Sequence, residues 1–372
     1  ESRLAHNLDW MQRFAERSGV RLAPHGKTTM APSLFQRQLA AGAWGITVAT
    51  AHQALVAHHH EVPRVLMANQ LVGRRNFEIV AGLLRDPAFE FFCLVDSTAN
   101  VDQLGRFFAA SGQSLPVLIE LGVAGGRTGV RTAGQELSLL EAIDRWPGTI
   151  RLAGVEVYEG VLREEREIRR LLRRAVETFQ RLADEHRFAR TPPLLSGAGS
   201  AWYDVVAEEF VKVRATAPVD IVLRPGCYLT HDVGVYRSAQ EEIQRRSPIA
   251  REMGEGLLPA LQVWAYVQSI PEPGRAIVGL GKRDAAFDAG LPVPTGRYRP
   301  GEAAPTAAPA HWEVTGMMDQ HAYLSIATDD DVAVGDMLAF DISHPCLTFD
   351  KWRYLLVVDD AYNVVDVVQT FF

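Results

Sequence analysis

A lysine follows the first apolar strand pattern of the chain. Residues 21–26 have the pattern of a short strand, and Lys27 comes directly after Pro24, His25 and Gly26. If such strands form a parallel barrel, reactive groups lie where strands end and loops begin, and this amine points into the barrel mouth. Burial there would lower the lysine pKa and allow a Schiff base with an aldehyde. The alternative is an ordinary solvated loop lysine.

Two small-residue loops have the composition of an anion site. The first runs into a helical pattern at 202–210, so that free backbone N–H groups and hydroxyls converge on it, which favours phosphate. Its candidate residues are Ser196, Gly197, Gly199 and Ser200. The second ends the next strand pattern at Arg224, Gly226 and Cys227. Barrels often bind phosphate with the loops after strands 7 and 8. Turns that merely need glycine are the alternative.

Two further side chains follow strand patterns. Arg127 lies in a glycine-rich segment at 122–129, where an arginine could hold an anionic oxygen. Tyr158 ends the strand pattern at 151–158 and could stack on, or hydrogen-bond to, a planar ring. A surface arginine on a flexible turn and a packed tyrosine are the competing interpretations.

A histidine and a cysteine are spaced as a pair of metal ligands. His344 and Cys346 end an extended pattern, and period-two alternation would put both side chains on one face. Imidazole and thiolate suit Zn²⁺, and two ligands favour an open site completed by water and substrate over a closed structural site. A core cysteine beside a polar histidine is the alternative. His321 is either a third active-site group or a loop histidine, and Cys93 has the surroundings of a core residue.

The elements that must position these residues fall into two parts. The first two thirds of the chain alternate short apolar runs with helical patterns. The eight candidate strands are 21–26, 45–50, 65–69, 89–96, 116–123, 151–158, 194–197 and 221–225. Eight strand–helix repeats in about 230 residues predict a (β/α)8 TIM barrel, with an open doubly wound sheet as the alternative. The absence of G-x-G-x-x-G after the first strand counts against a dinucleotide fold.

The pattern changes after residue 247. Apolar alternation replaces helical spacing, which predicts a second, mainly antiparallel β domain. The expected strands are 261–270, 276–280, 311–317, 322–327, 336–343 and 354–358. Residues 290–309 are rich in Pro, Gly and Ala, and we expect a loop there. The predicted domains are therefore residues 1–247 and 248–372.

Composition restricts the function classes. The 372 residues are 47% hydrophobic with net charge -7 and three cysteines. These values argue against a disordered chain, a nucleic-acid-binding surface and a disulfide scaffold, and they favour a cytoplasmic protein. No apolar run is long enough for a membrane span. Since the chain starts at Glu1 inside a helical pattern, we expect that an N-terminal segment is missing, which weakens the targeting prediction.

Taken together, these segments resemble the D-serine dehydratase / D-threonine aldolase family of pyridoxal-phosphate (PLP) enzymes, which have an alanine-racemase-like barrel and a β domain. The matching segments are 24–28, 45–50, 125–129, 223–226 and 344–346, and the resemblance covers essentially the whole chain. Residues 279–288 and 344–352 resemble the branch usually called amino acid deaminase. The family's N-terminal strand is absent from this sequence.

The resemblance implies a role for each matching position. Lys27, preceded by His25 among the cofactor-binding residues, would form the Schiff base with PLP and act as base at Cα. Arg127 would lie near the phenolic oxygen, and Tyr158 and Arg224 near the pyridine ring. The phosphate residues would be Ser196, Gly197, Gly199, Ser200, Gly226 and Cys227. His344 and Cys346 would hold a divalent metal, Zn²⁺ first and Mn²⁺ second. The family usually has alanine at position 26 and threonine or a similar residue at position 227.

The expected activity is β-elimination from D-3-hydroxy amino acids such as D-serine, which gives a 2-oxo acid and ammonia. Retro-aldol cleavage to glycine and an aldehyde, as in D-threonine aldolase, is the first alternative. Racemization would need a second base that the sequence does not identify. A non-catalytic PLP-binding protein would usually lack residues 248–372 as a second domain. The resemblance also suggests a homodimer with a small-molecule D-amino acid as its ligand.

Overall fold

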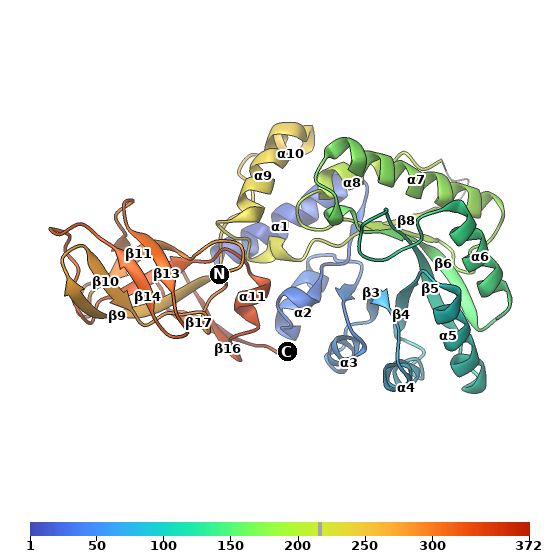
Figure 1. Cartoon of the computed structure of the whole chain (residues 1–372), viewed down its shortest axis with the longest axis horizontal. Coiled ribbons are helices and arrows are strands. Elements are labelled where there is room, and N and C mark those ends of the chain that lie inside the picture. Colours follow the sequence, from blue (N-terminus) through green and yellow to red (C-terminus); the bar gives the residue numbers. More distant parts are fainter. Residues whose placement is uncertain (215–217) are drawn as a thin grey trace.

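Parallel strands closed into a barrel form the larger part of the molecule (Figure 1). The computed structural model describes residues 1–214 and 218–372. Within them, the parallel strands are β1 (Arg21–Leu22), β2 (Ile46–Val48), β3 (Arg64–Gln70), β4 (Glu90–Val95), β5 (Leu115–Leu121), β6 (Ile150–Val157), β7 (Leu194–Gly197) and β8 (Asp220–Leu223). Every one of them overlaps a strand expected from the sequence.

The barrel closes between β1 and β2. Hydrogen bonding runs in the order β1-β8-β7-β6-β5-β4-β3-β2, and Trp44 N–H donates to Leu22 O (2.6 Å) while Thr47 N–H donates to Pro24 O (2.9 Å). The predicted (β/α)8 barrel is confirmed, and the open doubly wound alternative is wrong.

Apolar side chains cover both faces of the barrel strands. In β4, Phe92 and Leu94 belong to a cluster with Leu66 and Leu118, whereas Phe91 and Cys93 belong to the larger core that includes the helices. Successive strand residues point to opposite faces, so a continuous apolar run fills the barrel interior and the helix contact together. Cys93 is fully buried, as expected of a core residue.

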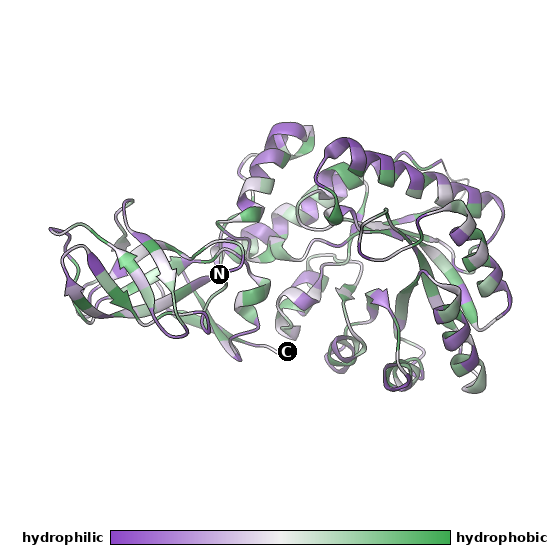
Figure 2. Ribbon diagram, in the orientation of Figure 1, coloured by the Kyte–Doolittle hydropathy of each residue, from purple (hydrophilic) through white to green (hydrophobic). Residues whose placement is uncertain are grey.

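Amphipathic helices surround the barrel. They are α1 (Ser2–Arg17), α2 (Pro32–Ala40), α3 (Ala51–His59), α4 (Arg74–Leu83), α5 (Thr98–Ala110), α6 (Ala133–Asp144), α7 (Glu165–Asp184), α8 (Tyr203–Phe210), α9 (Val235–Arg246) and α10 (Pro248–Glu252). Figure 2 shows α7 as strongly hydrophilic on its outer side, while its apolar residues, including Ile168, Leu172 and Phe179, are buried. None of the helices described in residues 1–214 and 218–372 is both long and apolar enough to cross a membrane.

Three short 3-10 turns follow barrel strands and shape the carboxyl end of the barrel. They are η1 (Gly26–Thr28) after β1, η2 (Glu159–Val161) after β6 and η3 (Cys227–Leu229) after β8. Each turn begins within four residues of the end of its strand, so Lys27 and Cys227 lie close to the carboxyl ends of β1 and β8, whereas Arg127 lies in the longer segment between β5 and α6.

The remaining part of the chain is an antiparallel β domain, on the left in Figure 1. Its strands are β9 (Gln262–Glu272), β10 (Arg275–Val278), β11 (Val293–Tyr298), β12 (Thr306–Ala307), β13 (Glu313–Met317), β14 (Ala322–Ser325), β15 (Met337–Asp341), β16 (Tyr354–Val358) and β17 (Val364–Gln369). The first seven form a sheet in the order β12-β11-β15-β9-β10-β14-β13, and β16 pairs with β17. The expected antiparallel character is confirmed.

The loop expected at 290–309 is wrong, because this stretch contains β11 and β12. Pro294 and Gly296 lie at a register shift where β11 pairs with β15, and bulges tolerate both residue types. The high content of Pro, Gly and Ala at 290–309 therefore did not indicate the strand β11. The helix α10 also lies just past residue 247 and packs against α1 and α9, so the antiparallel sheet itself begins at Gln262.

Candidate active site

The turn that carries Lys27 is held against the loop after β8. A Cβ added to Gly226 would come within 2.5 Å of Thr28 Oγ1 and 2.9 Å of the His25 backbone oxygen, so only glycine allows this close approach. His25 N–H donates to Pro225 O (3.4 Å). These contacts fix Lys27 at the carboxyl end of the barrel, where the sequence predicted it.

Lys27 lies among groups that change its proton affinity. Burial by the surrounding protein lowers its pKa, Cys346 and Cys227 raise it, and Arg127 and Arg224 lower it further. The net direction is downward, although the side chain as a whole remains exposed. Part of the long Lys27 side chain is open to solvent at the end of the barrel. Nearby protein atoms and charges still change the pKa of its amine. A lowered pKa increases the fraction of neutral amine, the form that attacks an aldehyde.

A buried contact between an arginine and a glutamic acid lies next to this turn. Arg224 Nη2 contacts Glu156 Oε1 and also donates to Val157 O (3.1 Å), and both side chains are almost fully buried. Burial raises the pKa of Glu156 to about 8, against the opposing effect of Arg224. Among the residues that the structure describes, Arg224 Nε, Glu156 Oε2 and His25 Nδ1 are buried without a hydrogen-bond partner. These unpartnered polar atoms can form hydrogen bonds with the polar atoms of a ring placed against them.

Arg127 and Tyr158 lie face to face. The Arg127 guanidinium carbon is 4.6 Å from the centre of the Tyr158 ring. Burial raises the pKa of Tyr158, so the phenol stays protonated and can donate a hydrogen bond. A Cβ on Gly199 would lie 3.3 Å from the Tyr158 ring, which brings the loop after β7 to the same place.

The loops after β7 and β8 are joined by backbone hydrogen bonds to side-chain oxygens. Ser200 Oγ accepts from Gly226 N–H (3.2 Å) and Cys227 N–H (3.1 Å). These N–H groups converge where the sequence predicted an anion site. The buried carboxylate of Glu159 accepts hydrogen bonds from two further N–H groups of this region, those of Gly199 (2.7 Å) and Ala198 (3.2 Å).

Two of the predicted phosphate residues face elsewhere. Ser196 Oγ is fully buried and donates to Val222 O (3.0 Å) inside the barrel. Gly197 lies against Phe210 and Val206 of α8. Their small size serves the packing of β7, whereas Ser200 and Gly226 form the loop surface.

The β domain brings its histidine and cysteine to the Lys27 turn. Cys346 Sγ lies 3.4 Å from Thr28 Oγ1 and 3.7 Å from Cys227 Sγ. Hydrogen bonding with Cys346 is the largest cause that raises the pKa of His344 to about 9, with Asp288 adding to it against burial. The two predicted metal ligands are therefore neighbours, although strand alternation does not explain it. His344 follows β15, and Cys346 begins the short helix α11 (Cys346–Phe349).

Across residues 1–214 and 218–372, no group of three or more His, Cys, Asp or Glu side chains is arranged to hold a metal ion. The His344–Cys346 pair thus supplies two protein ligands, and water or substrate would have to supply the others. His321 lies exposed in the turn between β13 and β14 and is not among the groups that perturb Lys27 or His344. The structure does not bring His321 together with the other predicted residues.

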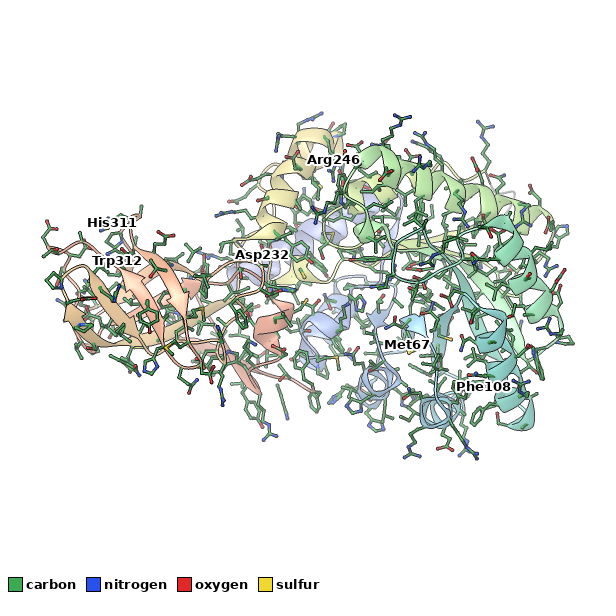
Figure 3. All side chains as sticks on the ribbon, in the orientation of Figure 1. Met67, Phe108, Asp232, Arg246, His311 and Trp312 are labelled. Atoms are coloured by element: carbon green, nitrogen blue, oxygen red, sulfur yellow. The ribbon has the colours of Figure 1, made fainter. Side chains whose placement is uncertain are left out.

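Four acidic residues near the site escaped the sequence analysis. Glu156 and Glu159 are described above, and Asp288 contacts His344. Asp232 is buried and its Oδ1 accepts from Gly234 N–H (2.8 Å) and Tyr236 N–H (3.1 Å). Figure 3 shows Asp232 where the barrel meets the β domain, far from His311 and Trp312. The partners of Glu156, Glu159 and Asp288 come from distant segments, so the local sequence gives no signal that these carboxyl groups lie at the site.

Comparison with known proteins decides the family. A model described as "Alanine racemase, N-terminal domain" matches residues 1–230. The chain belongs to this family. A second model, "Putative serine dehydratase domain", matches residues 260–358.

Relatives support the resemblance inferred from the sequence. The chain is 28% identical over 362 residues to D-threonine aldolase of Arthrobacter sp., which covers 95% of this chain and 86% of the relative. It is 32% identical over 160 residues to D-threo-3-hydroxyaspartate dehydratase of Delftia sp. (strain HT23), which covers 42% of this chain and 41% of the relative. The expected family resemblance is confirmed.

Solved structures agree with the fold. D-threonine aldolase from Filomicrobium marinum superimposes with a TM-score of 0.80 at 25% identity, over 99% of this chain and 92% of that one. The Delftia dehydratase superimposes with a TM-score of 0.76 at 22% identity, over 100% of this chain and 95% of that one. Both show a barrel and β domain of this kind.

Proposed function

We propose that this protein is a PLP- and divalent-metal-dependent lyase that removes water, and then ammonia, from D-3-hydroxy amino acids of the D-serine kind. The observation that carries the proposal is the contact between the two parts of the chain. Cys346 lies 3.4 Å from Thr28, so the His344–Cys346 pair stands beside the lysine turn. A lysine with a lowered pKa and a metal-ligand pair are thereby available to the same small substrate.

The residues present fit PLP. Lys27 would bind the aldehyde carbon, and the unpartnered Arg224 Nε and His25 Nδ1 are buried polar atoms against which the ring can lie. Arg127 and Tyr158 would contact the ring edge. Ser200, Gly226 and Cys227 would surround the phosphate. Bound there, PLP would supply an electron sink that makes the substrate Cα proton acidic.

Lys27 then has a second task. Its amine would also take the Cα proton of the substrate, because the lowered pKa keeps the amine neutral more often than in an ordinary lysine. The contact with Glu156 would hold the Arg224 guanidinium beside the position of the PLP ring. A guanidinium has no accessible neutral form, so Arg224 donates hydrogen bonds without giving up its proton.

His344 and Cys346 would hold the divalent metal, which supplies a Lewis acid for a substrate hydroxyl. The Delftia dehydratase has been solved as a cysteine variant in a metal-free form and as a histidine variant, and the two substituted positions are two residues apart in that chain. His344 and Cys346 have the same spacing. This likeness supports elimination as the first candidate.

Retro-aldol cleavage is the second candidate. Matches over most of the chain to D-threonine aldolases of Arthrobacter sp. and Filomicrobium marinum support it equally on overall similarity. In this reaction a base takes the β-hydroxyl proton, the Cα–Cβ bond breaks, and an aldehyde leaves. Lys27 and the metal held by His344 and Cys346 would then take part in the reaction that leaves glycine as the second product.

Product analysis distinguishes the two reactions. The purified protein is incubated with D-serine, D-threonine and D-threo-3-hydroxyaspartate, with and without a chelator. A 2-oxo acid with equimolar ammonia supports elimination, and glycine with an aldehyde supports the aldolase reaction. PLP bound without any turnover of these substrates would overturn the lyase proposal in favour of a carrier. Turnover that a chelator does not reduce would overturn the metal requirement.

A further inference from the structure

Two segments that stand out in the sequence, 279–288 and 344–352, lie against one another in the structure. Ala286 N–H donates to Thr348 Oγ1 (3.1 Å), and Trp352 Nε1–H donates to Asp284 O (2.7 Å). The second segment carries the metal pair, but the first has no role in the function proposed above. The contacts suggest that the first segment supports the second.

Asp288 ends the first segment and reaches the metal ligand of the second. His344 Nδ1 is 2.8 Å from Asp288 Oδ2. The fully buried Thr348 donates its hydroxyl to His344 O (3.0 Å) and accepts from Ala286. Ser343 Oγ also donates to Gly290 O (2.6 Å). The His344 ring is thus held by the Asp288 carboxylate and its backbone oxygen by the Thr348 hydroxyl, while the hydroxyl of the preceding residue, Ser343, bonds the loop between β10 and β11.

The hydrogen bond to Asp288 has a chemical consequence. A carboxylate can only accept, so it selects the imidazole tautomer with the proton on Nδ1. When a metal ion displaces the other ring proton, Nε2 is therefore the nitrogen that offers its lone pair. A carboxylate behind a ligating histidine orients the ring and increases the basicity of the ligand nitrogen.

We infer that Asp288 is a positioning residue of the metal site, which holds His344 with Nε2 as the ligand atom. This inference rests on the proposed metal-dependent function. The competing explanation is an ordinary surface ion pair, since the Asp288 side chain is 41% exposed. An ordinary pair would affect stability slightly and metal affinity not at all.

The test is the affinity of the protein for Zn²⁺ alone, measured by competition with a chromophoric chelator. We expect Asp288→Ala to weaken Zn²⁺ binding about 10–100-fold. Asp288→Asn should recover part of this loss, because its amide oxygen still accepts from Nδ1–H without the charge. Asp319→Ala is the matched control, as Asp319 lies on a neighbouring turn in an exposed pair with Arg283 (3.5 Å). It should bind Zn²⁺ like the wild type.

A second readout separates positioning from misfolding. With saturating Co²⁺, Asp288→Ala should retain the thiolate-to-cobalt charge-transfer band from Cys346, and its melting temperature without metal should equal that of the wild type. Equal Zn²⁺ affinity of the wild type and Asp288→Ala would overturn the inference and leave the proposed function standing. If the wild type itself binds no Zn²⁺ or Mn²⁺, the proposed metal requirement fails instead.

Discussion

The sulfur atoms of Cys227 and Cys346 lie 3.7 Å apart, although 119 positions separate them in the chain. One belongs to the turn η3 of the barrel and the other to α11 of the β domain. Hydrogen bonding between the sulfurs raises the pKa of Cys227 well above its usual value and lowers the pKa of Cys346 to about 4. Cys227 therefore keeps its proton and donates it toward a Cys346 thiolate, the form that binds a metal.

Cys346 should be the reactive cysteine of the metal-free protein. A group with a pKa near 4 is already a thiolate above pH 5, so its alkylation by iodoacetamide should change little between pH 6 and pH 8. An ordinary thiol would react almost 100-fold faster across that interval. Peptide mass spectrometry after brief labelling measures each site.

Cys93 and Cys227 provide internal controls for this labelling, because burial and the sulfur contact raise their pKa values. Added Zn²⁺ should protect Cys346. Equal labelling of Cys227 and Cys346, or labelling of Cys346 that rises steeply with pH, would contradict the assignment of the thiolate.

Lys27→Ala should abolish the yellow absorbance of the cofactor-bearing protein and its activity together. In the proposed function this side chain would supply both the covalent link and the base, and general-base catalysis alone contributes about 10²–10⁴-fold. Absorbance spectra of dialysed protein and initial rates measure the two effects. Lys212→Ala is the control, since Lys212 is an exposed partner of Glu208 and Glu209. A Lys27 variant that keeps colour and turnover would exclude the role.

Ser200→Ala should weaken binding of PLP more than binding of pyridoxal, which lacks the phosphate. The Ser200 hydroxyl, which accepts from Gly226 and Cys227, would donate its own hydrogen to the phosphate, and one such hydrogen bond is worth about 1 kcal/mol, or about fivefold in affinity. Ser196→Ala is the matched control, because the Ser196 hydroxyl is already bound to Val222 O. Titrations of the cofactor-free proteins give the ratio of the two affinities. An unchanged ratio in Ser200→Ala would remove it from the phosphate site.

Glu156 should make the folded protein less stable as the pH rises. Its pKa in the folded state is about 8, above its ordinary value of 4.5, so the folded state binds more protons than the unfolded state between these values. The free energy of unfolding of the wild type should therefore decrease relative to Glu156→Gln from about pH 5 to pH 8. Each unit of pKa difference corresponds to about 1.4 kcal/mol, so a loss of a few kcal/mol is expected.

Urea unfolding of the cofactor-free wild type and Glu156→Gln at several pH values gives this difference, since all other titrating groups are common to both proteins. A difference that stays constant, or one that grows in favour of the wild type with rising pH, would show that Arg224 keeps Glu156 ionised throughout.

The local hydrophobic pattern predicted the barrel strands and helices well. A barrel strand is buried on both faces and gives a continuous apolar run, whereas a surrounding helix is buried on one face and gives apolar residues at helical spacing. The strand at 194–197 lies where an apolar run predicted it. The outer face of α7 is exposed, as its charged residues predicted. The same reasoning fails at β11, since Pro294 and Gly296 are tolerated only because β15 pairs with them across a bulge. The partner strand, which is 40 or more residues away, is not visible to a local window.

The sequence by itself determined the order of strands and helices and the presence of a lysine, two small-residue loops and a His-x-Cys pair at strand ends, because side-chain periodicity and turn chemistry are local properties. Only the tertiary structure decided that Cys346 would touch Thr28 and Cys227, that Ser200 and not Ser196 would face the loop after β8, and that Asp288 would bind His344. Such contacts depend on how the β domain packs on the barrel, where α11 lies against η1 and β17 against α2, and elements so far apart in the chain give no local signal that they will meet.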